Sequence, residues 1–422
     1  MNVFKFVFQS RGAGNVLRRT AQITSRFGSG PGRMARRFER IMDVLEGFDI
    51  RPTFPITALP MSRNPVFAHR LLARGAELAV HAWSHTDLTA LDRKTQSEHM
   101  GRAVDLFRKH GIPFTGFRAP YLHWNEDTMR VVEDYKFRYS SNQAVFWNVL
   151  DTEGLTAVQR SGLEHGKAFY RPLGGDAAIV LPQRRRGFVE IPVSLPDDEI
   201  LFDRMYIHDA DHLGELWRKI LEETYRRGEL FTLQLHPERI DFFAGALQGL
   251  LSEARRRNPS VWIATLDAIA EWWTDKSGNR VDLAREGSNQ RASIKACRGA
   301  TVFLRTNGAE RIMEPGSIVV EGAARPCAAV SPESNREAVQ ALVDMGFVVE
   351  VAGRDGGHAL HLGKVQDARA ETIRACVAKL DACPGPLLRF GTWPHGARSA
   401  LAVTGDIDAL TVWDFVHRLR GA

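Results

Sequence analysis

The chain has 422 residues, of which 44% are hydrophobic and 25% charged, a composition typical of a soluble globular protein with room for two or three domains. The formal net charge is +6, but residues 1–40 carry nine basic side chains against one acid, so the remainder is slightly acidic. The four cysteines contain no Cys-x-x-Cys pair, which fits neither a disulfide framework nor a structural zinc site.

The N-terminal segment is basic and partly apolar. Its apolar stretch, residues 1–10, is short and broken by Lys5, so we expect neither a secretory signal nor a spanning helix and place the protein in the cytoplasm. The basic residues within 1–40 favour peripheral contact with an anionic inner membrane face, with a solvated arginine-rich helix as the alternative. The rest of the chain has no basic stripe, so nucleic acid is not an expected partner.

From residue 34 onward, predicted helices and strands alternate, as in a parallel sheet or barrel. Apolar positions between Met34 and Phe48 recur close to every 3.6 residues and predict an amphipathic helix. The same reasoning predicts helices near 65–74, 94–109, 126–135, 213–227 and 266–273, and strands at 51–58, 76–80, 115–117, 190–193 and 230–235.

A polar stretch with two glycines, residues 274–293, predicts a linker to a second, smaller unit. This unit offers strands near 300–305, 317–321, 348–352 and 360–362, and helices that start near Ser331 and Asp367. After it, the chain is expected to end with a strand at 399–408 and a helix at 411–420.

Polar side chains stand at the ends of several predicted strands. His81 and His85 have the four-residue spacing that lets two imidazoles share one metal ion, although such a pair also arises by chance. Trp83 and Ser84 fill inner positions between them, and this stretch has no glutamate to act as the base of a helical metalloprotease. A metalloprotease is therefore disfavoured.

Three further segments supply an arginine, a histidine and two carboxylates. Arg118 leaves a strand into a turn stiffened by Pro120, and a guanidinium can orient a carboxylate while keeping it ionised. His236 ends an apolar strand, and Asp406 and Asp408 end the last one. Each alone has a structural explanation: a surface arginine, a capped core histidine or a helix N-cap. Together they are the parts of a metal-dependent amide hydrolase.

These motifs resemble the polysaccharide deacetylases of the NodB-homology group, also called carbohydrate esterase family 4. The family's metal motif, His-(Ser/Thr)-x-x-His after Gly-x-Glu-(Ile/Leu), matches residues 75–85, with Ala82 at the usual hydroxyl position. Arg-x-Pro-Tyr matches residues 118–121, and Leu-x-Leu-His-Pro matches residues 233–237. The family's opening acidic motif should come first, yet here it comes last, as Thr404-Gly-Asp-Ile-Asp408. The resemblance therefore implies a circular permutation.

The resemblance implies an α/β fold, a distorted (β/α)7-type barrel that is circularly permuted, with a second, smaller α/β domain inserted before the last strand. The deacetylase barrel would occupy residues 1–280, of which residues 1–30 form a basic extension. Residues 290–395 would be the small α/β domain, which has no counterpart that the resemblance identifies. Residues 397–422 would supply the strand and helix that complete the barrel.

By motif position, the resemblance implies that His81, His85 and Asp408 bind one divalent metal ion. Zinc fits these ligand types, and cobalt or manganese are alternatives. Asp406 would be the general base, and Arg118 would hold it ionised.

The remaining roles fall on the other motifs. His236 would protonate the leaving amine, and the backbone N–H of Tyr121, next to Pro120, would bind the oxyanion. His123 and Trp124 are expected to line the pocket, because an aromatic face suits the apolar side of a sugar ring, with loop packing as the alternative.

The implied activity is hydrolysis of an N-acyl group, above all N-acetyl, from an amino sugar in a polysaccharide or a glycan precursor. The basic N-terminal segment fits a lipid-linked precursor at a membrane surface. Two alternatives stay open: hydrolysis of non-peptide C–N bonds in a small amide, and a non-catalytic glycan-binding protein. The family's Asp-Trp motif is not evident, since Trp147 and Asp151 match it only loosely, so the pocket wall at that place stays open.

Overall fold

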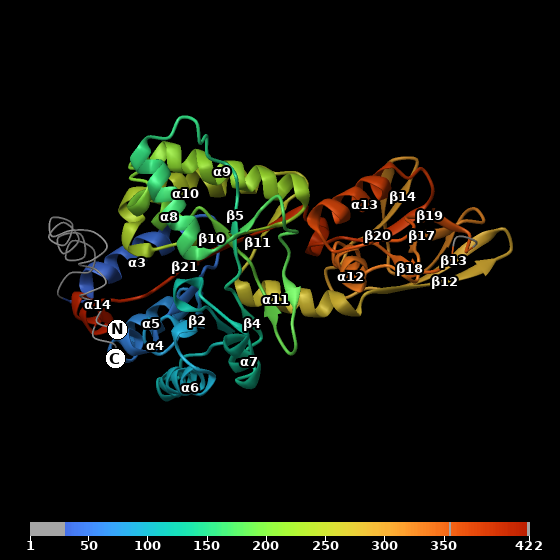
Figure 1. The fold of residues 1–422 in the computed structure, drawn as a ribbon. Coiled ribbons are helices and arrows are strands. Elements are labelled where there is room, and N and C mark those ends of the chain that lie inside the picture. Colours follow the sequence, from blue (N-terminus) through green and yellow to red (C-terminus); the bar gives the residue numbers. More distant parts are fainter. Residues whose placement is uncertain (1–29, 354–355, 420–422) are drawn as a thin grey trace.

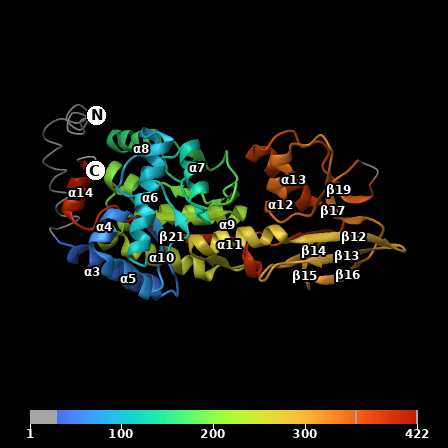
Figure 2. The same ribbon diagram turned by 90° about the horizontal axis from the view of Figure 1, so that it is seen from below.

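The structure is a computed structural model that describes residues 30–353 and 356–419. The predicted basic extension, residues 1–30, therefore lies almost wholly outside the described residues. The described elements form two parts that lie end to end (Figures 1 and 2). We call them the half-barrel, residues 32–275 with 399–419, and the second unit, residues 280–390.

A curled and mostly parallel sheet runs through the half-barrel (Figure 1), which confirms the predicted α/β class. Its strand order is β6-β5-β9-β10-β21-β1-β2-β3-β4-β8-β7, with β11 also paired to β21. The strands are β1 (Thr53–Ile56), β2 (Glu77–Val80), β3 (Gly116–Phe117), β4 (Tyr139–Ser140), β5 (Ala144–Phe146), β6 (Leu173–Gly174), β7 (Gln183–Arg184), β8 (Val189–Glu190), β9 (Val193–Leu195), β10 (Leu230–Leu235), β11 (Val261–Ile263) and β21 (Ser399–Gly405).

Helices surround this sheet (Figure 2). They are α3 (Gly32–Glu46), α4 (Ala58–Arg63), α5 (Pro65–Ala73), α6 (Arg93–Lys109), α7 (Glu126–Asp134), α8 (Ala157–Tyr170), α9 (Ala210–Arg227), α10 (Ile240–Arg256), α11 (Leu266–Asp275) and α14 (Val412–Leu419). As the 3.6-residue period predicts, α3 buries Phe38, Ile41 and Leu45 on one face. Across residues 30–353 and 356–419, every helix is too short or too polar to cross a bilayer.

The C-terminal strand β21 lies inside the sheet, between β10 and β1. All seven of its residues are buried, and it pairs in parallel register with β10 from Leu230↔Ala400 to Leu235↔Gly405. On its other side, Thr404 pairs with Thr53 of β1. The predicted strand at the chain's end is thus confirmed, and it joins strands that lie far apart in the sequence.

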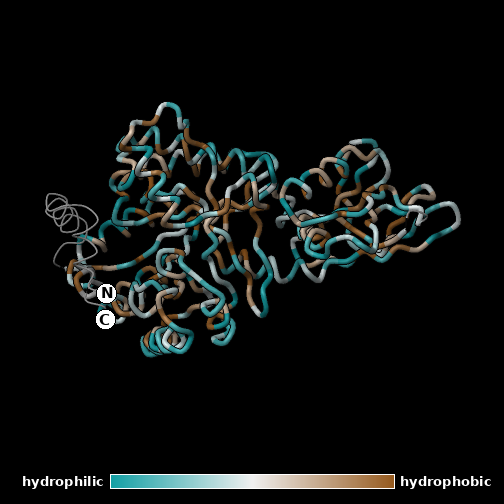
Figure 3. Tube along the Cα trace, in the orientation of Figure 1, coloured by the Kyte–Doolittle hydropathy of each residue, from teal (hydrophilic) through white to brown (hydrophobic). Residues whose placement is uncertain are grey.

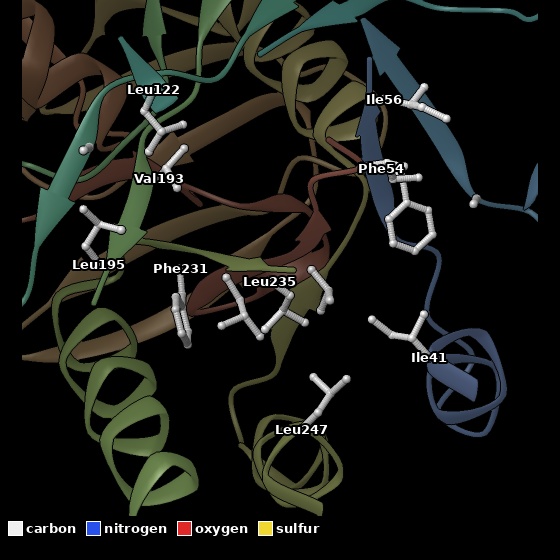
Figure 4. Close-up of a cluster of buried hydrophobic side chains, with 14 of the residues drawn as sticks. Ile41, Phe54, Ile56, Leu122, Val193, Leu195, Phe231, Leu235 and Leu247 are labelled. Carbon is white, nitrogen blue, oxygen red and sulfur yellow. The ribbon is translucent and has the colours of Figure 1, made fainter. Parts of the chain in front are cut away.

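The core lies between the sheet and its helices, where apolar residues concentrate along the strands (Figure 3). Figure 4 shows Ile41 of α3, Phe54 of β1, Phe231 and Leu235 of β10 and Leu247 of α10, all fully buried, directed into this space. Burying a side chain of this size stabilises the fold by about 1.5–3 kcal/mol. Packing of this density fixes where the polar strand ends emerge.

The second unit contains three small sheets, β12-β13-β16, β15-β14-β20 and β18-β17-β19. Only the last of these is parallel within the described part of this unit. Its elements are β12 (Arg280–Glu286), β13 (Asn289–Lys295), β14 (Val302–Thr306), β15 (Ala309–Met313), β16 (Gly316–Val320), β17 (Arg325–Val330), α12 (Arg336–Asp344), β18 (Val349–Val351), β19 (His358–His361), α13 (Ala370–Ala382) and β20 (Leu387–Phe390).

The linker predicted at residues 274–293 is wrong. α11 continues to Asp275, and β12 then pairs with β13 in an antiparallel ladder from Arg280↔Lys295 to Glu286↔Asn289. β12 is an edge strand whose side chains are largely exposed, so its polar composition imitates a linker. The regular alternation of buried and exposed residues in β13 was the signal of a strand.

Hydrogen bonds from the two connecting segments, residues 276–279 and 391–398, hold the second unit and the half-barrel together. Lys276 Nζ donates to the backbone oxygens of Asp344 and Thr392, at 2.7 and 3.0 Å. Trp393 Nε1 donates to Gly228 O at 2.9 Å. Burial lowers the pKa of Lys276 to about 7, because few polar groups replace the water around its ammonium. The contact between the two parts therefore includes buried polar groups.

Candidate active site

The polar residues expected at strand ends follow neighbouring strands of the sheet. β10 and β21 pair up to Leu235 and Gly405, and β1 and β2 pair up to Ile56 and Val80. β3 joins β2 through Phe117. Because parallel strands end at one edge of their sheet, the residues that follow them converge there.

His81 follows β2 and is fully buried. Its Nδ1 lies 2.8 Å from Arg118 O. A carbonyl oxygen only accepts, so Nδ1 carries the proton and Nε2 keeps its lone pair. In the described part of the chain, Nε2 is buried without a hydrogen bond. A histidine oriented through a backbone carbonyl in this way is a typical metal ligand.

His85 and Asp408 complete a cluster around that lone pair. Asp408 Oδ1 lies 3.1 Å from His85 Nε2 and 3.5 Å from His81 Nε2. One possible ligand atom from each of the three residues lies within 4.8 Å of the others. Two imidazoles and a carboxylate are ligand types of zinc and related divalent ions, so these residues fit the predicted metal.

Asp406 lies beside this cluster and is 5% exposed. Its Oδ1 accepts a hydrogen bond from Arg118 Nη1 at 2.9 Å, and its Oδ2 accepts one from Gln234 Nε2 at 3.2 Å. Arg118, fully buried, also donates to Thr404 Oγ1 at 2.8 Å and to Ser141 Oγ at 2.9 Å. A guanidinium with several hydrogen-bond partners holds the carboxylate beside it in one orientation.

Gly405 has no side chain, so the chain just before Asp406 can lie close to Pro237 and Phe54. A Cβ at this position would lie 2.8 Å from Pro237 Cγ and 2.9 Å from Phe54 Cε1, too close for any side chain. The backbone N–H of Asp406 donates to Leu235 O at 3.0 Å. The residues after β21 are thus held against the end of β10. His236 is the first residue after β10.

His236 is bonded to a carboxylate that the sequence reasoning missed. Its Nδ1 donates to Asp198 Oδ1 at 2.8 Å, and its backbone N–H donates to Asp198 Oδ2 at 3.0 Å. Arg239 Nη1 also reaches Asp198 Oδ2, at 3.1 Å. Burial lowers the pKa of His236, but the charge of Asp198 and its hydrogen bond outweigh this and raise the pKa well above its ordinary value. The imidazolium is therefore favoured.

A signal for Asp198 was present in the sequence. Asp197 and Asp198 follow β9, which the prediction placed near 190–193, and acids after a buried strand were the criterion applied to Asp406. The two residues matched loosely to the Asp-Trp motif lie elsewhere. Trp147 is buried with its Nε1 bonded to Ser194 Oγ at 3.3 Å, and Asp151 is an exposed turn residue.

Tyr121 lies against the cluster, in a short 3-10 turn that begins at Pro120. Its ring centroid is 4.4 Å from that of His85, edge to face. Its backbone has a φ of 62°, which is rare for a residue with a side chain. Strained conformations of this kind cluster at functional sites, where the surrounding structure maintains them.

His123 and Trp124 are placed differently from one another. His123 Nδ1 lies 2.8 Å from Asp87 Oδ2 and its Nε2 lies 2.8 Å from Phe169 O, so both ring nitrogens donate. The hydrogen bond that His123 donates to Asp87 raises the pKa of His123, although partial burial acts to lower it. The His123 ring thus connects its own loop to Asp87 and to the end of α8 at Phe169. Trp124 is half-buried, with the guanidinium of Arg185 at 6.0 Å from its ring centroid.

The comparison with protein families matches residues 18–140 of the chain to the model described as polysaccharide deacetylase. This segment is therefore similar to a polysaccharide deacetylase domain. That family implies a hydrolase that acts on N-acetyl groups of glycans, and it is generally metal-dependent. The matched segment contains His81, His85 and Arg118, whereas Asp406 and Asp408 lie outside it.

Two curated proteins are similar to parts of this chain. A peptidoglycan deacetylase-like protein, FGM2, of Gibberella zeae is 24% identical over 272 residues, which cover 58% of this chain and 76% of that protein. An uncharacterised 30.6 kDa protein of Geobacillus stearothermophilus is 26% identical over 121 residues, which cover 27% of this chain and 45% of that one.

The solved structures that are similar to this chain include a protein of Mycobacterium smegmatis named as a polysaccharide deacetylase. It has 20% identity and a TM-score of 0.45, and the match covers 59% of this chain and 81% of that one. Another is the PuuE allantoinase, with 19% identity and a TM-score of 0.44, covering 56% and 72%. The peptidoglycan deacetylase PdaC of Bacillus subtilis has 15% identity and a TM-score of 0.32, covering 57% and 85%.

Proposed function

We propose that this protein is a metal-dependent hydrolase that removes the N-acetyl group from an amino sugar in a polysaccharide or glycan precursor. One observation carries the proposal. The C-terminal strand brings Asp408 to within 3.1 Å of His85 Nε2 and places Asp406 on Arg118, so that a metal-ligand set and a bonded carboxylate stand side by side. The family assignment supports the reaction type.

His81, His85 and Asp408 would hold one divalent ion, zinc by ligand type, with cobalt or manganese as alternatives. Such an ion lowers the pKa of a water molecule that it binds and polarises the amide carbonyl. The ring orientation of His81, set by its bond to Arg118 O, supports this assignment.

The surrounding side chains would move the protons. Asp406, kept ionised by Arg118, would accept a proton from the attacking water. His236, kept protonated by Asp198, would deliver a proton to the leaving amine. The backbone N–H of Tyr121 would bind the oxygen that becomes negative. The products would be acetate and a free amino sugar.

Acetate release from a panel of N-acetylated sugars, oligosaccharides and lipid-linked precursors tests this proposal. Wild type, loaded with zinc, cobalt or manganese, is expected to release acetate from at least one of them. Asp406→Asn should bind the metal equally and lose about 10²–10⁴-fold in kcat. Stoichiometric metal without turnover on any glycan would favour a binding protein, and turnover only on small non-sugar amides would favour the other alternative.

We also propose that the chain is a circularly permuted deacetylase. The barrel would comprise residues 1–280 and 397–422, with residues 290–395 inserted as a small α/β domain before the last strand. The position of β21 between β10 and β1 supports this. Truncation after residue 396 should abolish acetate release and cooperative unfolding of the barrel. Retention of both would contradict the proposal.

A peripheral contact with an anionic membrane face, from the cytoplasmic side, remains a further proposal for residues 1–40. Residues 1–29 lie outside the described residues. Of the described arginines, Arg37 and Arg40 reach Asp241 at 3.1 and 2.6 Å and so also bind the protein's own fold. Deletion of residues 1–26 should reduce sedimentation with anionic liposomes. Unchanged sedimentation would remove both this contact and the argument for a lipid-linked substrate.

A further inference from the structure

An aromatic patch lies on two segments, one after β9 and one after β10. Asp198 belongs to the first segment and His236 to the second. We define the patch as Phe202, Tyr206 and His208, from the chain after β9, and Phe242, from the first turn of α10. The ring centroid of Phe202 is 4.4 Å from that of His208 and 4.6 Å from that of Phe242, and Tyr206 is 6.3 Å from His208. Four rings thus form one contiguous group.

The backbone beneath the patch directs the two outer rings into solvent. Met205 and Ile207 are buried, and their N–H groups donate to Ile200 O and Leu201 O, each at 2.9 Å. Between them, Tyr206 is 46% exposed, although its φ of 55° is strained for a residue with a side chain. The fold therefore maintains a strained backbone at this exposed position.

Ion pairs join this patch rigidly to the proposed acid. Arg239 is 5% exposed at its side chain and bridges Asp198, at 3.1 Å, and Asp203, at 2.5 Å. Asp198 in turn binds His236, and Asp203 adjoins Phe202. A buried arginine between two carboxylates holds both segments in one arrangement. The patch is therefore continuous with the candidate active site and fixed relative to it.

We propose that Phe202, Tyr206, His208 and Phe242 form a subsite for a second sugar ring, next to the ring that loses its acetyl group. The inference rests on the proposed function and deepens it, because it assigns an extended glycan, and not a single amino sugar, as the substrate. Aromatic faces bind the C–H faces of sugar rings, and the Tyr206 hydroxyl and His208 imidazole can bind hydroxyl groups. Binding energy gained away from the reacting bond can be used at the reacting bond.

The test compares N-acetylglucosamine oligosaccharides of one to five rings. Their binding is measured by titration calorimetry with the full chain carrying Asp406→Asn, and their hydrolysis is measured with the otherwise unchanged protein. Affinity is expected to rise with chain length. Tyr206→Gly, which removes the ring and relieves the positive φ, should lower the affinity for the pentamer about tenfold and the affinity for the single sugar less. His208→Ala should act in the same direction.

Two controls separate stacking from general damage. Tyr206→Phe keeps the ring and should retain most of the chain-length gain. Ile312→Ala, at a 69% exposed position on β15 of the second unit, should leave binding and hydrolysis unchanged. In hydrolysis, Tyr206→Gly should raise KM for the pentamer more than it lowers kcat.

The outcomes separate this proposal from the proposed function. A chain-length gain that survives Tyr206→Gly and His208→Ala overturns the subsite, while acetate release in the same samples leaves the hydrolase standing. Length-dependent binding that these variants remove, without acetate release from any compound of the full N-acetylated panel, supports a glycan-binding site at this patch and overturns the hydrolase. Absence of both binding and release overturns both.

Discussion

Among the described residues, the half-barrel contains two groups of three side chains that could hold a metal ion, and the second unit contains one. Asp197, Asp198 and His236 form one group of the half-barrel. The groups to compare are the other one, His81, His85 and Asp408, and the group of the second unit, Cys327, Glu350 and His358. By residue type the second set resembles a zinc site as closely as the first. The two regions differ in where the nearest guanidinium lies.

In the second unit, Arg325 binds Glu350 with both ends of its guanidinium, Nε at 3.0 Å from Oε2 and Nη2 at 2.5 Å from Oε1. His358 Nε2 shares Oε2, at 2.8 Å. The arginine thus supplies the positive charge that a metal ion would otherwise supply. Burial also raises the pKa of the Cys327 thiol to about 12, which disfavours the thiolate that binds metals.

In the half-barrel, Arg118 binds the neighbouring carboxylate, Asp406, at 2.9 Å. Asp408 instead faces two imidazoles, at 3.1 and 3.5 Å from its Oδ1. Donor types alone therefore do not define a metal site. Among the described residues, Arg118 forms an ion pair with Asp406 and Arg325 forms one with Glu350, so the surroundings of a carboxylate matter as well as its residue type.

The largest expected effect comes from removing one histidine in each region. His85→Ala should lose the bound divalent ion and lower acetate release by more than about 100-fold, because it removes a direct ligand. His358→Ala should retain both. Metal analysis after dialysis and an acetate assay measure the two effects. Loss of metal from His358→Ala, with retention in His85→Ala, would reverse the comparison.

The next effect concerns the two arginines. Arg118 is fully buried, so Arg118→Met leaves the buried Asp406 without its partner and should cost about 3–5 kcal/mol of unfolding free energy. Arg325 is 28% exposed at its side chain, and Arg325→Met should cost less than about 1 kcal/mol. Denaturant unfolding measures both. Equal losses would show that burial does not distinguish the two ion pairs.

The half-barrel also contains a histidine, His236, whose pKa is raised by a bonded carboxylate, Asp198. Because Asp198 raises the pKa of His236, the protonated acid should persist above the ordinary histidine range. In wild type, kcat/KM should fall only as the pH rises through this raised pKa. Asp198→Asn should move that alkaline limb to lower pH, with a loss of about 10²-fold at pH 8. Asp151→Asn, at an exposed turn, is the control; an unmoved limb in Asp198→Asn would exclude His236 as the acid.

The smallest effect is on stability as a function of pH, and it has opposite signs in the two regions. Burial raises the pKa of Asp197 from 3.8 to about 8, so the folded protein retains a proton that the unfolded chain has lost. Its contribution is complete below about pH 4 and is lost as the pH rises to about 8. The Arg325 bond holds the pKa of Glu350 below its usual 4.5, so its contribution is present above that value and lost in acid.

Asp197→Asn should flatten the fall in unfolding free energy between pH 4 and 8, and Glu350→Gln should flatten the loss below pH 4.5. The second effect should stay under about 1 kcal/mol, because Glu350 is partly exposed. Denaturant unfolding across this pH range measures both slopes. If Asp197→Asn leaves the slope between pH 4 and 8 unchanged, the Asp197 carboxyl does not keep its proton in the folded protein over this range.

Much of the half-barrel could be predicted from local patterns. The 3.6-residue period identified α3, and the apolar strands β2, β10 and β21 were expected where the structure has them. The second unit was harder, because β12 is an edge strand with few buried side chains. The helices α8 and α10 were also missed, although α10 buries a long apolar face.

For the site, the sequence by itself determined the residue types and their places at strand ends: His81 after β2, Arg118 after β3, His236 after β10 and the acids after β21. These places can be predicted because each strand is a run of apolar residues and the polar residue that follows the run marks its end. The family resemblance implied that Arg118 holds Asp406, and the structure pairs the two across 288 residues. Only the tertiary structure paired His236 with Asp198 and Arg325 with Glu350. The physical reason is that Coulomb energy and hydrogen bonding depend on distance in space, and strand order in the sheet sets that distance.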